Sequence, residues 1–387
     1  MKKEDYVYTP RSLSLDTVLG PEAVGNEPKV RLAIVGAGSM GAEHIETAMS
    51  VGKAEVVGIY DPYRPSIDYA LQFVDKPDVV KIYNSIREVG EDENVDAIII
   101  ASPNYLHLDN LRELLPFNKH ILCEKPMTST LKDALEVVEL TRNYEKVFHV
   151  GFEYREKAIY KEAAYQAKIR KDIGDIKMIY MQEHRVPFIE KWNQWNKFSD
   201  KSGGTLVEKC CHYFDLFSLF AESEPVKVYA SGAMDVNFRN FEFDGQFSDI
   251  IDNAFVIVDY ENGIRACLNI NMFSWKPEIH EYMAINGDKG SMYLRDAPYN
   301  EVYVGIRGET PTRRYKVELP ENISKTGTHS GSTYYEHLNF INAIQGRLEL
   351  SVSAEEGMRA IAIGAAAELS VKTGEPVYIK DLIASCR

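Results

Sequence analysis

One stretch decides the fold of this chain: residues 29–41 have the sequence KVRLAIVGAGSMG. Its first part, residues 30–35, is an apolar run rich in β-branched side chains, which is typical of a buried strand. Gly36, Gly38 and Gly41 follow at once in the spacing G-x-G-x-x-G, and a helical pattern comes next. A glycine-rich turn between a strand and a helix is the context that a dinucleotide fingerprint requires.

Each glycine has its own task in such a turn. Gly36 permits the tight turn, Gly38 lets the backbone approach a pyrophosphate, and Gly41 lets the helix lie close on the strand. The start of the helix, at Ser39 and Met40, offers unpaired N–H groups and a partial positive charge to phosphates. The pattern therefore predicts a nucleotide cofactor, and the alternative is a glycine turn with a purely structural role.

An acidic residue ends the second predicted strand, EVVGIYD at residues 55–61. Asp61 follows the first glycine at about the interval expected for the acid that binds ribose. A carboxylate there accepts hydrogen bonds from both adenosine ribose hydroxyls and repels a 2′-phosphate, which favours NAD. Arg64 could pair with a 2′-phosphate, so NADP stays possible, and Asp61 could instead cap the turn before Pro62.

Strands and helices alternate through the first part of the chain. Further apolar strands are predicted at 95–101, 120–124 and 147–151, with helices between them. We expect a doubly wound Rossmann domain over residues 29–151, preceded by a polar arm at 1–28. Because ligands of open α/β sheets bind at the carboxyl ends of the strands, the polar turns that follow these strands are candidate cofactor contacts.

The pattern changes after residue 151. Strands with one wet face, such as 176–184 and 253–260, follow a helical segment, and the pair Asn262-Gly263 predicts a hairpin turn. We expect residues 152–387 to form an α+β domain for substrate binding and oligomerisation, built on a large, mostly antiparallel open sheet.

Composition limits the class of protein further. The 387 residues suffice for two or three domains, and the net charge of −14 argues against nucleic acid or an anionic membrane as a partner. No apolar run reaches the ~20 residues of a membrane span. The N-terminus has no apolar signal core, so we expect a cytoplasmic protein. The five cysteines are scattered without a zinc-type C-x-x-C pair, which predicts free thiols and no metal site.

Two groups of polar residues have the chemistry of alcohol oxidation. Lys125, at a strand end beside the expected cofactor, could stabilise an alkoxide, or it could be a surface lysine in a turn. Glu208, His212 and Asp215 have helical spacing and would share one helix face. Histidine beside a carboxylate is a suitable general base, because the pKa of histidine lies near neutral pH. An ion pair on a helix surface and a metal site are the other interpretations.

Four motifs together resemble the Gfo/Idh/MocA oxidoreductases, a family that includes inositol, glucose and other sugar or polyol dehydrogenases. They are GAGSMG at 36–41, SPNYLH at 102–107, EKP at 124–126 and the segment 203–215, in that order. The resemblance covers residues 30–377. It implies an N-terminal Rossmann domain and a C-terminal α/β domain, one face of whose open sheet often forms an oligomer interface.

The resemblance also implies roles for single residues. Lys125 matches the lysine that contacts the reacting hydroxyl, and His212 matches the general acid/base. Glu208 takes the place of an aspartate that contacts substrate or orients the histidine, and Asp215 matches the acid after it. Residues at the strand ends are expected around the cofactor: Ser102, Asn104, His107 and Glu124.

The sequence departs from the family pattern near the expected substrate. Glu208 is one methylene longer than the usual aspartate, Cys210 stands where glycine is common, and Lys209 adds a cation. Other aromatic, polar and charged residues fall where the family has its pocket or substrate-side loops: Tyr154, Arg155, His184, Arg185, Trp192, Trp195, Asn196 and His329. Such a mixture suits a sugar ring, with its apolar face and many hydroxyls; a structural role is the alternative for each residue.

The sequence thus predicts an NAD-dependent dehydrogenase, with NADP possible, that acts on a secondary hydroxyl of a sugar, inositol, polyol or glycoside. A homodimer or homotetramer formed through the C-terminal sheet is expected. One alternative keeps the cofactor bound and uses transient oxidation for glycoside cleavage or epimerisation without net redox change. A non-catalytic sugar or nucleotide sensor is the other, and the presence of both Lys125 and His212 argues against it.

Overall fold

The structure, a computed structural model, falls into two compact units that are each assembled from separate stretches of chain. It describes residues 6–8, 11–12, 27–310, 312–327, 329–348 and 352–386. The Rossmann unit comprises Leu19–Lys157 and Pro320–Met358, and the large-sheet unit comprises Met1–Val18, Ala158–Leu319 and Arg359–Arg387. This division differs from the contiguous boundaries expected after residues 28 and 151, because a late segment packs with the first unit.

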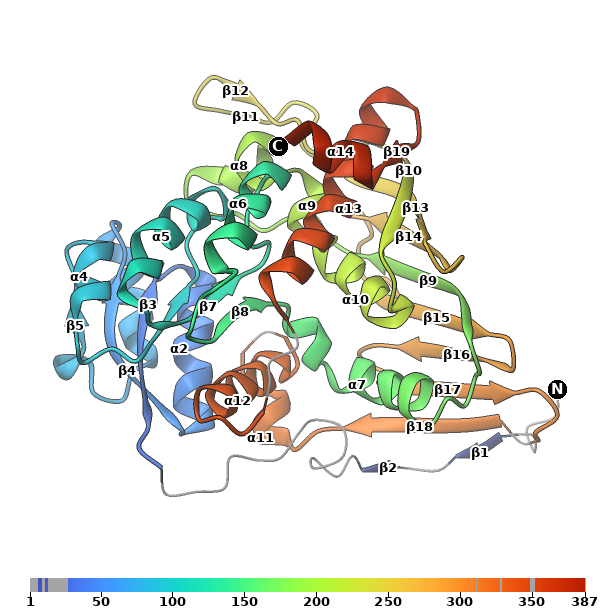
Figure 1. Cartoon of the computed structure of the whole chain (residues 1–387), viewed down its shortest axis with the longest axis horizontal. Coiled ribbons are helices and arrows are strands. Elements are labelled where there is room, and N and C mark those ends of the chain that lie inside the picture. The colour runs from blue at the N-terminus through green and yellow to red at the C-terminus, as the bar shows by residue number, and fades with distance from the viewer. Residues whose placement is uncertain are drawn as a thin grey trace. The chain divides into compact units, whose positions relative to one another are not determined.

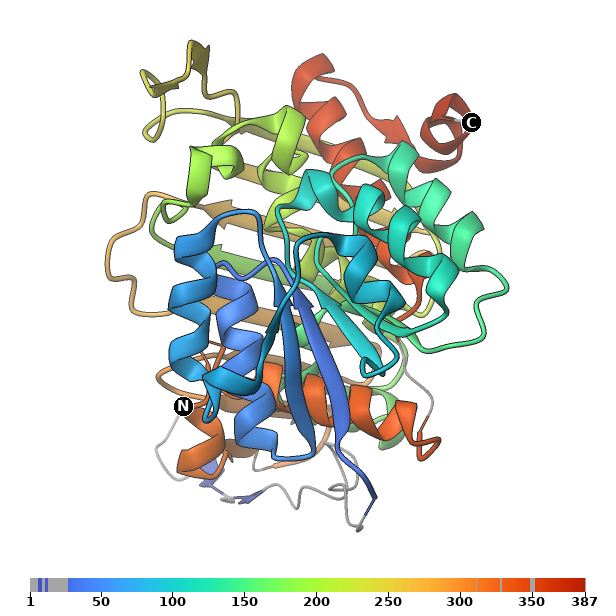
Figure 2. The same cartoon turned by 90° about the vertical axis from the view of Figure 1, so that its left-hand side faces the viewer.

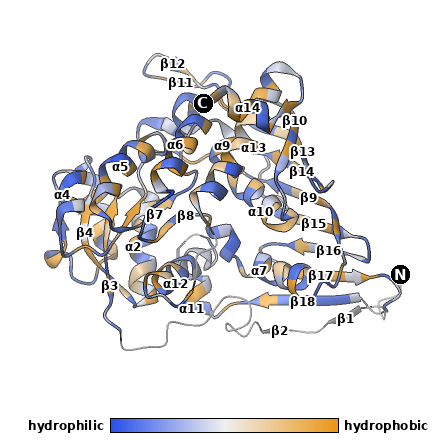
Figure 3. Ribbon diagram, viewed as in Figure 1, coloured by the Kyte–Doolittle hydropathy of each residue, from blue (hydrophilic) through white to orange (hydrophobic). Residues whose placement is uncertain are grey.

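The Rossmann unit contains a six-stranded parallel sheet in the order β5-β4-β3-β6-β7-β8. Its strands are β3 (Val30–Val35), β4 (Ala54–Tyr60), β5 (Lys81–Ile82), β6 (Ala97–Ile100), β7 (His120–Glu124) and β8 (Phe148–Gly151). The central strands β3 and β6 are almost entirely buried, as expected when helices cover both faces of a parallel sheet, and the sheet is among the most hydrophobic parts of the chain (Figure 3). The predicted doubly wound sheet is confirmed.

Helices cover both faces of this sheet (Figure 2). On one face lie α2 (Ser39–Val51) and α3 (Arg64–Ala70), and on the other lie α4 (Ile86–Glu91), α5 (His107–Leu114) and α6 (Leu131–Thr141). The late segment adds α11 (Glu321–Ser324) and α12 (Ser332–Ile344) to the unit. Helix α12 lies beside α2 and covers it, which explains why residues from beyond the large sheet belong to this unit (Figure 1).

The large-sheet unit is built on an open sheet in the order β1-β18-β17-β16-β15-β9-β14-β13-β10-β19 (Figure 1). Its main strands are β9 (Ile176–His184), β10 (Pro225–Ala233), β13 (Asn253–Tyr260), β14 (Arg265–Asn271), β15 (Glu281–Gly287), β16 (Gly290–Arg295), β17 (Glu301–Ile306) and β18 (Thr312–Glu318). Most pairs are antiparallel, with β9 and β14 parallel to each other. The predicted fold class is confirmed, and Gly263 has the positive φ of the predicted hairpin turn.

Short strands extend the edges of this sheet. In the expected N-terminal arm, β1 (Tyr6–Tyr8) and β2 (Arg11–Ser12) pair in parallel with β18, and the rest of the arm up to residue 26 lies outside the described residues. At the other edge, β19 (Val377–Tyr378) pairs with β10 and is followed by α14 (Ile379–Cys386). A separate hairpin of β11 (Glu242–Phe243) and β12 (Gln246–Phe247) stands off the sheet.

The helices of the large-sheet unit include α7 (Ala158–Ala164), α8 (Ser199–Ser202), α9 (Thr205–Glu208), α10 (Cys211–Ala221) and α13 (Ala354–Thr373), whose first turn belongs to the other unit. Alternate residues of the central strands are buried, for example Val256 and Val258 of β13, whereas their neighbours are exposed. In the described part of the chain, none of the helices combines the length and apolarity needed to cross a membrane. All five cysteines are free thiols.

Candidate active site

The glycine turn after β3 packs as its sequence pattern predicts. Gly36 has φ +94°, and a Cβ there would lie 2.5 Å from the backbone nitrogen of Ser102. A Cβ at Gly41 would overlap the carbonyl oxygen of Gly36, so only glycine lets α2 lie this close to the strand. A Cβ at Gly38, in contrast, would meet no atom within 4 Å among the described residues. The glycine at position 38 therefore leaves open space beside the backbone, where a ligand can approach.

The carboxylate of Asp61, at the end of β4, holds this turn from the side. Its Oδ2 accepts the N–H of Ala37 at 2.7 Å, and its Oδ1 accepts the N–H of Tyr63 at 2.8 Å. The bond to Tyr63 is the turn cap that was the alternative role predicted for Asp61. The bond to Ala37 places the carboxylate next to the glycine turn. The exposed Arg64 forms an ion pair with Asp68 at 2.8 Å on its own helix.

The turns after β6 and β7 are tied together by a buried histidine. The ring nitrogens of His107 lie 2.9 Å from the carbonyl oxygen of Ser102 and 3.0 Å from that of Pro126. Burial lowers the pKa of His107, although the carbonyl oxygens of Ser102 and Pro126 act in the opposite direction. Asn110 donates to the Ser102 hydroxyl at 2.7 Å. The amide nitrogen of Asn104 is buried and has no hydrogen-bond partner among the described residues.

These residues fit a dinucleotide. Helix α2 begins at Ser39 with no side-chain cap and no acidic residue in its first turn, so its first N–H groups and dipole are available to phosphate. The open space at Gly38 and the unsatisfied amide of Asn104 lie at the carboxyl-terminal ends of neighbouring strands. Buried polar groups are normally hydrogen-bonded, so an orphaned amide at a strand end points to a bound partner there.

Glu124, the last residue of β7, is held by a chain of buried histidines. Its Oε1 lies 2.8 Å from Nε2 of His44 on α2, and Nδ1 of His44 lies 2.8 Å from Nε2 of His337 on α12. Burial alone would raise the pKa of Glu124, but the hydrogen bond with His44 and the nearby Lys125 lower it below its usual value. Its Oε2 accepts the backbone N–H of Lys125 at 3.0 Å. The residue expected to contact the reacting hydroxyl thus follows an ionised and oriented carboxylate.

A second buried carboxyl group, that of Glu336 on α12, lies beside this chain. One ligand atom each from His44, Glu124 and Glu336 lies within 4.8 Å of the others, which is the spacing of a metal site. Both ring nitrogens of His44 are already hydrogen-bonded within the protein. Burial and the nearby Glu124 and Glu153 raise the pKa of Glu336 well above its usual range, which leaves a neutral acid. Both carboxyl oxygens of Glu336 are buried and have no hydrogen-bond partner among the described residues, so the cluster contains an unsatisfied polar group.

Three residues expected on the substrate side lie in the Rossmann unit. Nδ1 of His329 is 2.7 Å from the carboxylate of Glu43 on α2, and its Nε2 is 3.9 Å from Glu153. Burial disfavours a charged His329, but Glu43 and Glu153 outweigh this effect and raise its pKa. Arg155 is buried in an ion pair with Glu356 at 2.8 Å. The ring of Tyr154 is buried, with the ammonium of Lys157 at 3.8 Å from its centroid.

The single helix that the spacing of Glu208, His212 and Asp215 predicts is interrupted in the structure. Helix α9 ends at Glu208, and α10 begins at Cys211, so the prediction that Glu208 shares one continuous helix with His212 and Asp215 is wrong. The carbonyl of Thr205 accepts the N–H groups of both Lys209 and Cys210, at 3.1 and 3.3 Å, and this widened turn separates the two helices. His212 and Asp215 do lie three residues apart on α10, and both are buried.

Charged residues surround the end of α9 within the large-sheet unit. Lys209 Nζ lies 3.2 Å from the buried carboxylate of Glu183 on β9, and Arg185 lies 3.6 Å from the same oxygen. Lys191 lies 3.8 Å from Glu208. The predicted substrate residues Arg185 and Lys209 are therefore brought together by Glu183, a residue that was not singled out from sequence. His184 follows it at the end of β9.

Trp192, Trp195 and Asn196, which were predicted to contact substrate, differ in burial within the segment between β9 and α8. Trp195 is buried and has the ammonium of Lys191 at 4.7 Å from its ring, whereas Trp192 is half exposed. Asn196 is fully buried, and its amide donates to the carbonyl of Ile189 at 3.0 Å. Asn196 thus shapes the segment from inside, whereas Trp192 lies partly at its surface.

The N-terminus of α9 rests on α13. Glu368 Oε1 accepts the N–H of Leu206 at 2.9 Å, and a Cβ at Gly204 would overlap this carboxyl group. Burial raises the pKa of Glu368 to about 7. The turn that leads into Glu208 is therefore positioned by a carboxyl group that sequence analysis did not identify.

Comparison with known proteins assigns both units. The description "Oxidoreductase family, NAD-binding Rossmann fold" matches residues 30–152, and "Oxidoreductase family, C-terminal alpha/beta domain" matches residues 167–379. The chain belongs to the Gfo/Idh/MocA oxidoreductase family. It is an oxidoreductase with an NAD-binding domain, as the sequence motifs predicted, and the glycine turn, Asp61 and Asn104 are the residues that fit the cofactor.

Two named relatives match 92% and 69% of this chain. The myo-inositol 2-dehydrogenase of Thermotoga maritima is 24% identical over 363 residues, which is 92% of this chain and 100% of that protein. The inositol 2-dehydrogenase of Pseudarthrobacter chlorophenolicus is 29% identical over 276 residues, or 69% of this chain and 77% of that protein. A solved levoglucosan dehydrogenase in complex with NADH and levoglucosan has the same fold, with a TM-score of 0.78 at 17% identity, covering 91% of this chain and 99% of the other.

Several residues of the site escaped the reasoning from sequence. They are the buried polar residues on α2, α12 and β9: Glu43, His44, Glu336, His337 and Glu183. One signal was present, because Glu43 and His44 stand among small and apolar residues on a helix that must pack against the sheet. Polar residues on a face that is buried require partners, but the partner segment 332–344 lies too far along the chain to be inferred from pattern.

Proposed function

We propose that this protein is an NAD-dependent dehydrogenase that transfers a hydride between nicotinamide and a secondary hydroxyl of a sugar, inositol, other polyol or glycoside. The observation that carries the proposal is the chain from His337 through His44 to Glu124, which fixes the strand end that presents Lys125 in the NAD-binding unit. The names of the relatives, which include inositol dehydrogenases, support the class of substrate.

The proposed mechanism divides the proton chemistry between two residues. His212 takes the proton of the substrate hydroxyl, and Asp215, one turn later on α10, stabilises the imidazolium that forms. The ammonium of Lys125 donates a hydrogen bond to the same oxygen and stabilises the developing alkoxide. NAD, which the glycine turn and Asp61 would hold, would supply the acceptor for the hydride of the carbinol carbon. In the direction of reduction, His212 returns the proton to the oxygen.

The surroundings of Glu208 support a substrate with several hydroxyls. Lys209, Arg185 and Lys191 offer donors, and the carboxylates of Glu183 and Glu208 offer acceptors, all within the large-sheet unit. Since this charged cluster contains both signs, it suits a polyhydroxylated neutral molecule, whose hydroxyls both donate and accept. We propose that these residues orient the substrate, and that Asp61 favours NAD over NADP through its carboxylate beside the glycine turn.

Two single substitutions test the proposal. Lys125→Ala and His212→Ala should each lower kcat by about 10²–10⁴, the range for acid–base groups, while NADH binding followed by fluorescence stays within a few fold of the wild type. Turnover is measured as NADH formation with a panel of inositols, aldoses and glycosides. Wild-type turnover in either variant would contradict the assigned roles.

A redox-neutral reaction is the second candidate, because the irregular segment 185–201 holds more aromatic and charged groups than one small polyol requires. In that case the enzyme oxidises a glycoside transiently, eliminates or epimerises it, and reduces the product with the same bound cofactor. Product analysis by mass spectrometry and NMR distinguishes the two, since this activity converts substrate without net NADH formation.

We also propose that the large sheet forms an interface between copies of this chain. Its outer face carries exposed apolar side chains from neighbouring strands, namely Met178, Tyr229, Phe255 and Ile257. Tyr229 and Ile257 are cross-strand partners, so the apolar side chains are continuous across β10 and β13. Contiguous exposed apolar surface of this kind marks association in soluble proteins. A homodimer or homotetramer would cover it.

A further inference from the structure

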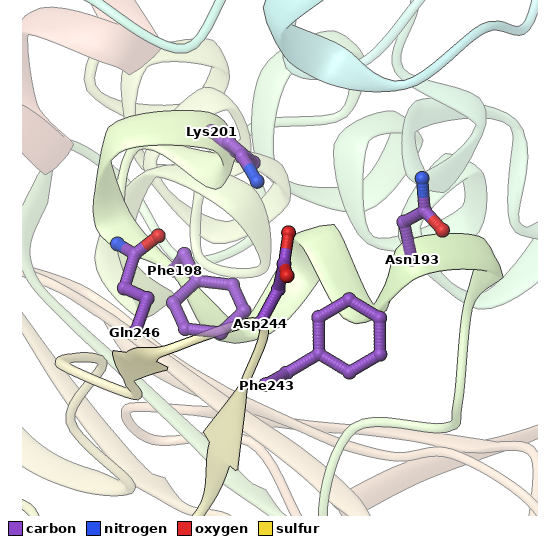
Figure 4. Close-up of a pocket in the computed structure, with 6 residues that line it drawn as sticks. All are labelled: Asn193, Phe198, Lys201, Phe243, Asp244 and Gln246. Carbon is purple, nitrogen blue, oxygen red and sulfur yellow. The ribbon is translucent and has the colours of Figure 1, made fainter.

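A cavity of about 330 Å³ lies in the large-sheet unit, and none of its lining residues is among those proposed to orient the substrate (Figure 4). It is enclosed by the segment that precedes α9 and by the hairpin β11–β12. Its lining residues are Asn193, Phe198, Lys201, Phe243, Asp244 and Gln246. The volume lies at the lower end of the range for small-molecule pockets, which suits a single ring rather than a nucleotide.

The lining combines aromatic rings with neutral and charged hydrogen-bonding groups. The ring of Phe198 is buried, whereas that of Phe243 is 38% exposed and stands on the hairpin (Figure 4). Two amides, one ammonium and one carboxylate complete the walls, so donors and acceptors are both present. The charges of Lys201 and Asp244 balance, which favours a neutral ligand over a phosphate or a sugar acid. An aromatic face with mixed hydrogen-bonding groups is the chemistry that binds a pyranose ring.

The backbone at Asn193 is strained in a way that favours a ligand-binding role. Asn193 and Gln194 are consecutive non-glycine residues in the left-handed region, with φ values of 52° and 53°. Gln194 donates its N–H to the carbonyl of Lys191 at 2.8 Å, and its side chain accepts from Lys197, so the conformation is held from both sides. Strained residues of this kind persist where the surrounding structure over-determines them, and they cluster at ligand clamps.

The cavity is connected through short stretches of the same unit to the residues proposed to bind substrate. Lys191, two residues before Asn193, reaches Glu208 at 3.8 Å. On the other side, Lys201 belongs to α8, which is followed after Gly203 and Gly204 by α9, whose last residue is Glu208. The cavity and the Glu208 region have no lining residue in common, so a ligand that occupied both would need more than one ring.

Resting on the proposed function, we infer that this cavity is a second sugar subsite, which binds a neutral pyranose ring linked to the ring that is oxidised. The preferred substrate is then a disaccharide or a similar glycoside rather than a free monosaccharide. Phe243 supplies the stacking face, and Asn193, Asp244 and Gln246 supply hydrogen bonds to the ring hydroxyls. The hairpin β11–β12 carries specificity, since it contributes three of the six lining residues.

The test measures sugar binding on the full-length protein loaded with NADH and, separately, turnover of the same sugars with NAD. Isothermal titration calorimetry compares glucose with cellobiose and maltose, and galactose with lactose. The subsite predicts that at least one disaccharide binds about tenfold more tightly than its monosaccharide, and that Phe243→Ala abolishes this difference, because one aromatic stacking interaction corresponds to about that factor. Asn193→Gly should also lower the affinity for the disaccharide, because it removes the side-chain amide; glycine itself tolerates the left-handed backbone at this position.

The same hairpin offers a matched control. Phe247, on the facing strand and 62% exposed, does not line the cavity, so Phe247→Ala should bind every sugar as the wild type does. If no disaccharide binds more tightly than its monosaccharide, or if Phe243→Ala and Phe247→Ala behave alike, the subsite is refuted. Tight disaccharide binding that depends on Phe243, without NADH formation or product, supports the subsite and contradicts the proposed dehydrogenase. NADH formation without any preference for disaccharides supports the proposed dehydrogenase and contradicts the subsite.

Discussion

Replacing Glu368 with glutamine should remove a large part of the pH dependence of stability in the large-sheet unit. The carboxyl group of Glu368 accepts the N–H of Leu206 at the start of α9, and burial raises its pKa to about 7 from an ordinary value of 4.5. The folded protein thus holds this proton more tightly than the unfolded chain does. The resulting stabilisation is complete below about pH 4.5 and is lost as the pH rises through 7.

The magnitude follows from the two pKa values. Their difference corresponds to about 3 kcal/mol when Glu368 is fully ionised, of which about 2 kcal/mol is lost between pH 5.5 and 8.5. Glutamine keeps the side-chain oxygen that accepts from Leu206 but has no proton to lose. The free energy of unfolding of Glu368→Gln should therefore fall less than that of the wild type over this range, by about 2 kcal/mol.

Urea unfolding followed by circular dichroism at pH 5.5 and 8.5 measures this difference. Comparing each protein with itself at two pH values cancels the contributions of all groups that the substitution leaves alone. Glu355→Gln, at an exposed position of the same helix α13, is the control and should retain the wild-type pH dependence. If Glu368→Gln and the wild type lose the same free energy of unfolding, the argument from the burial of this carboxyl group is wrong.

Four further substitutions address the cofactor and the assembly. Asp61→Ala should lower the affinity for NAD more than that for NADP, because it removes the hydrogen-bond acceptor beside the glycine turn. An unchanged ratio of the two dissociation constants would contradict the proposed preference for NAD. Gly38→Ala should lower the affinity for NADH at least tenfold and leave the melting temperature unchanged. Gly41→Ala should lower both the affinity and the melting temperature, because a Cβ at position 41, unlike one at position 38, overlaps protein atoms. Phe255→Lys should shift the protein toward monomers in analytical ultracentrifugation, and a monomeric wild type would contradict the proposed interface.

The sequence predicted those parts of the fold that rest on local patterns. The strand, the three glycines and the acid at Asp61 are neighbours along the chain, and each has a conformational or chemical requirement that few residue types meet. The hairpin at Gly263 is of the same kind. These elements could be placed because their physical causes act over a few residues.

The break between α9 and α10 could not be predicted in that way. Residues 204–220 contain no proline, and the only glycine is at their start, so propensity favours one continuous helix. The interruption lies at the carbonyl of Thr205, which accepts the N–H groups of both Lys209 and Cys210, while Glu368 caps the start of α9 at Leu206. Residue propensity does not report this local widening, which places Glu208 outside the helix that carries His212.

The buried histidine chain was missed for a related reason. His44, Glu124 and His337 come from three distant parts of the sequence, and each alone is an ordinary polar residue. Their proximity depends on α12, which returns to the Rossmann unit after the whole large sheet has been built. No periodicity within a window of the sequence reports such a return.

That return has a consequence for how the protein is made. A ribosome that has finished Lys157 has produced every strand of the Rossmann sheet, but not α12, which buries Glu43 and His44 on α2. The nascent NAD-binding unit must wait with a polar, uncovered helix face while Ala158–Leu319 is synthesised, for roughly 10 to 30 s at common elongation rates. A fragment that stops at Lys157 therefore has Glu43 and His44 on α2 without their partners Thr333 and His337 on α12.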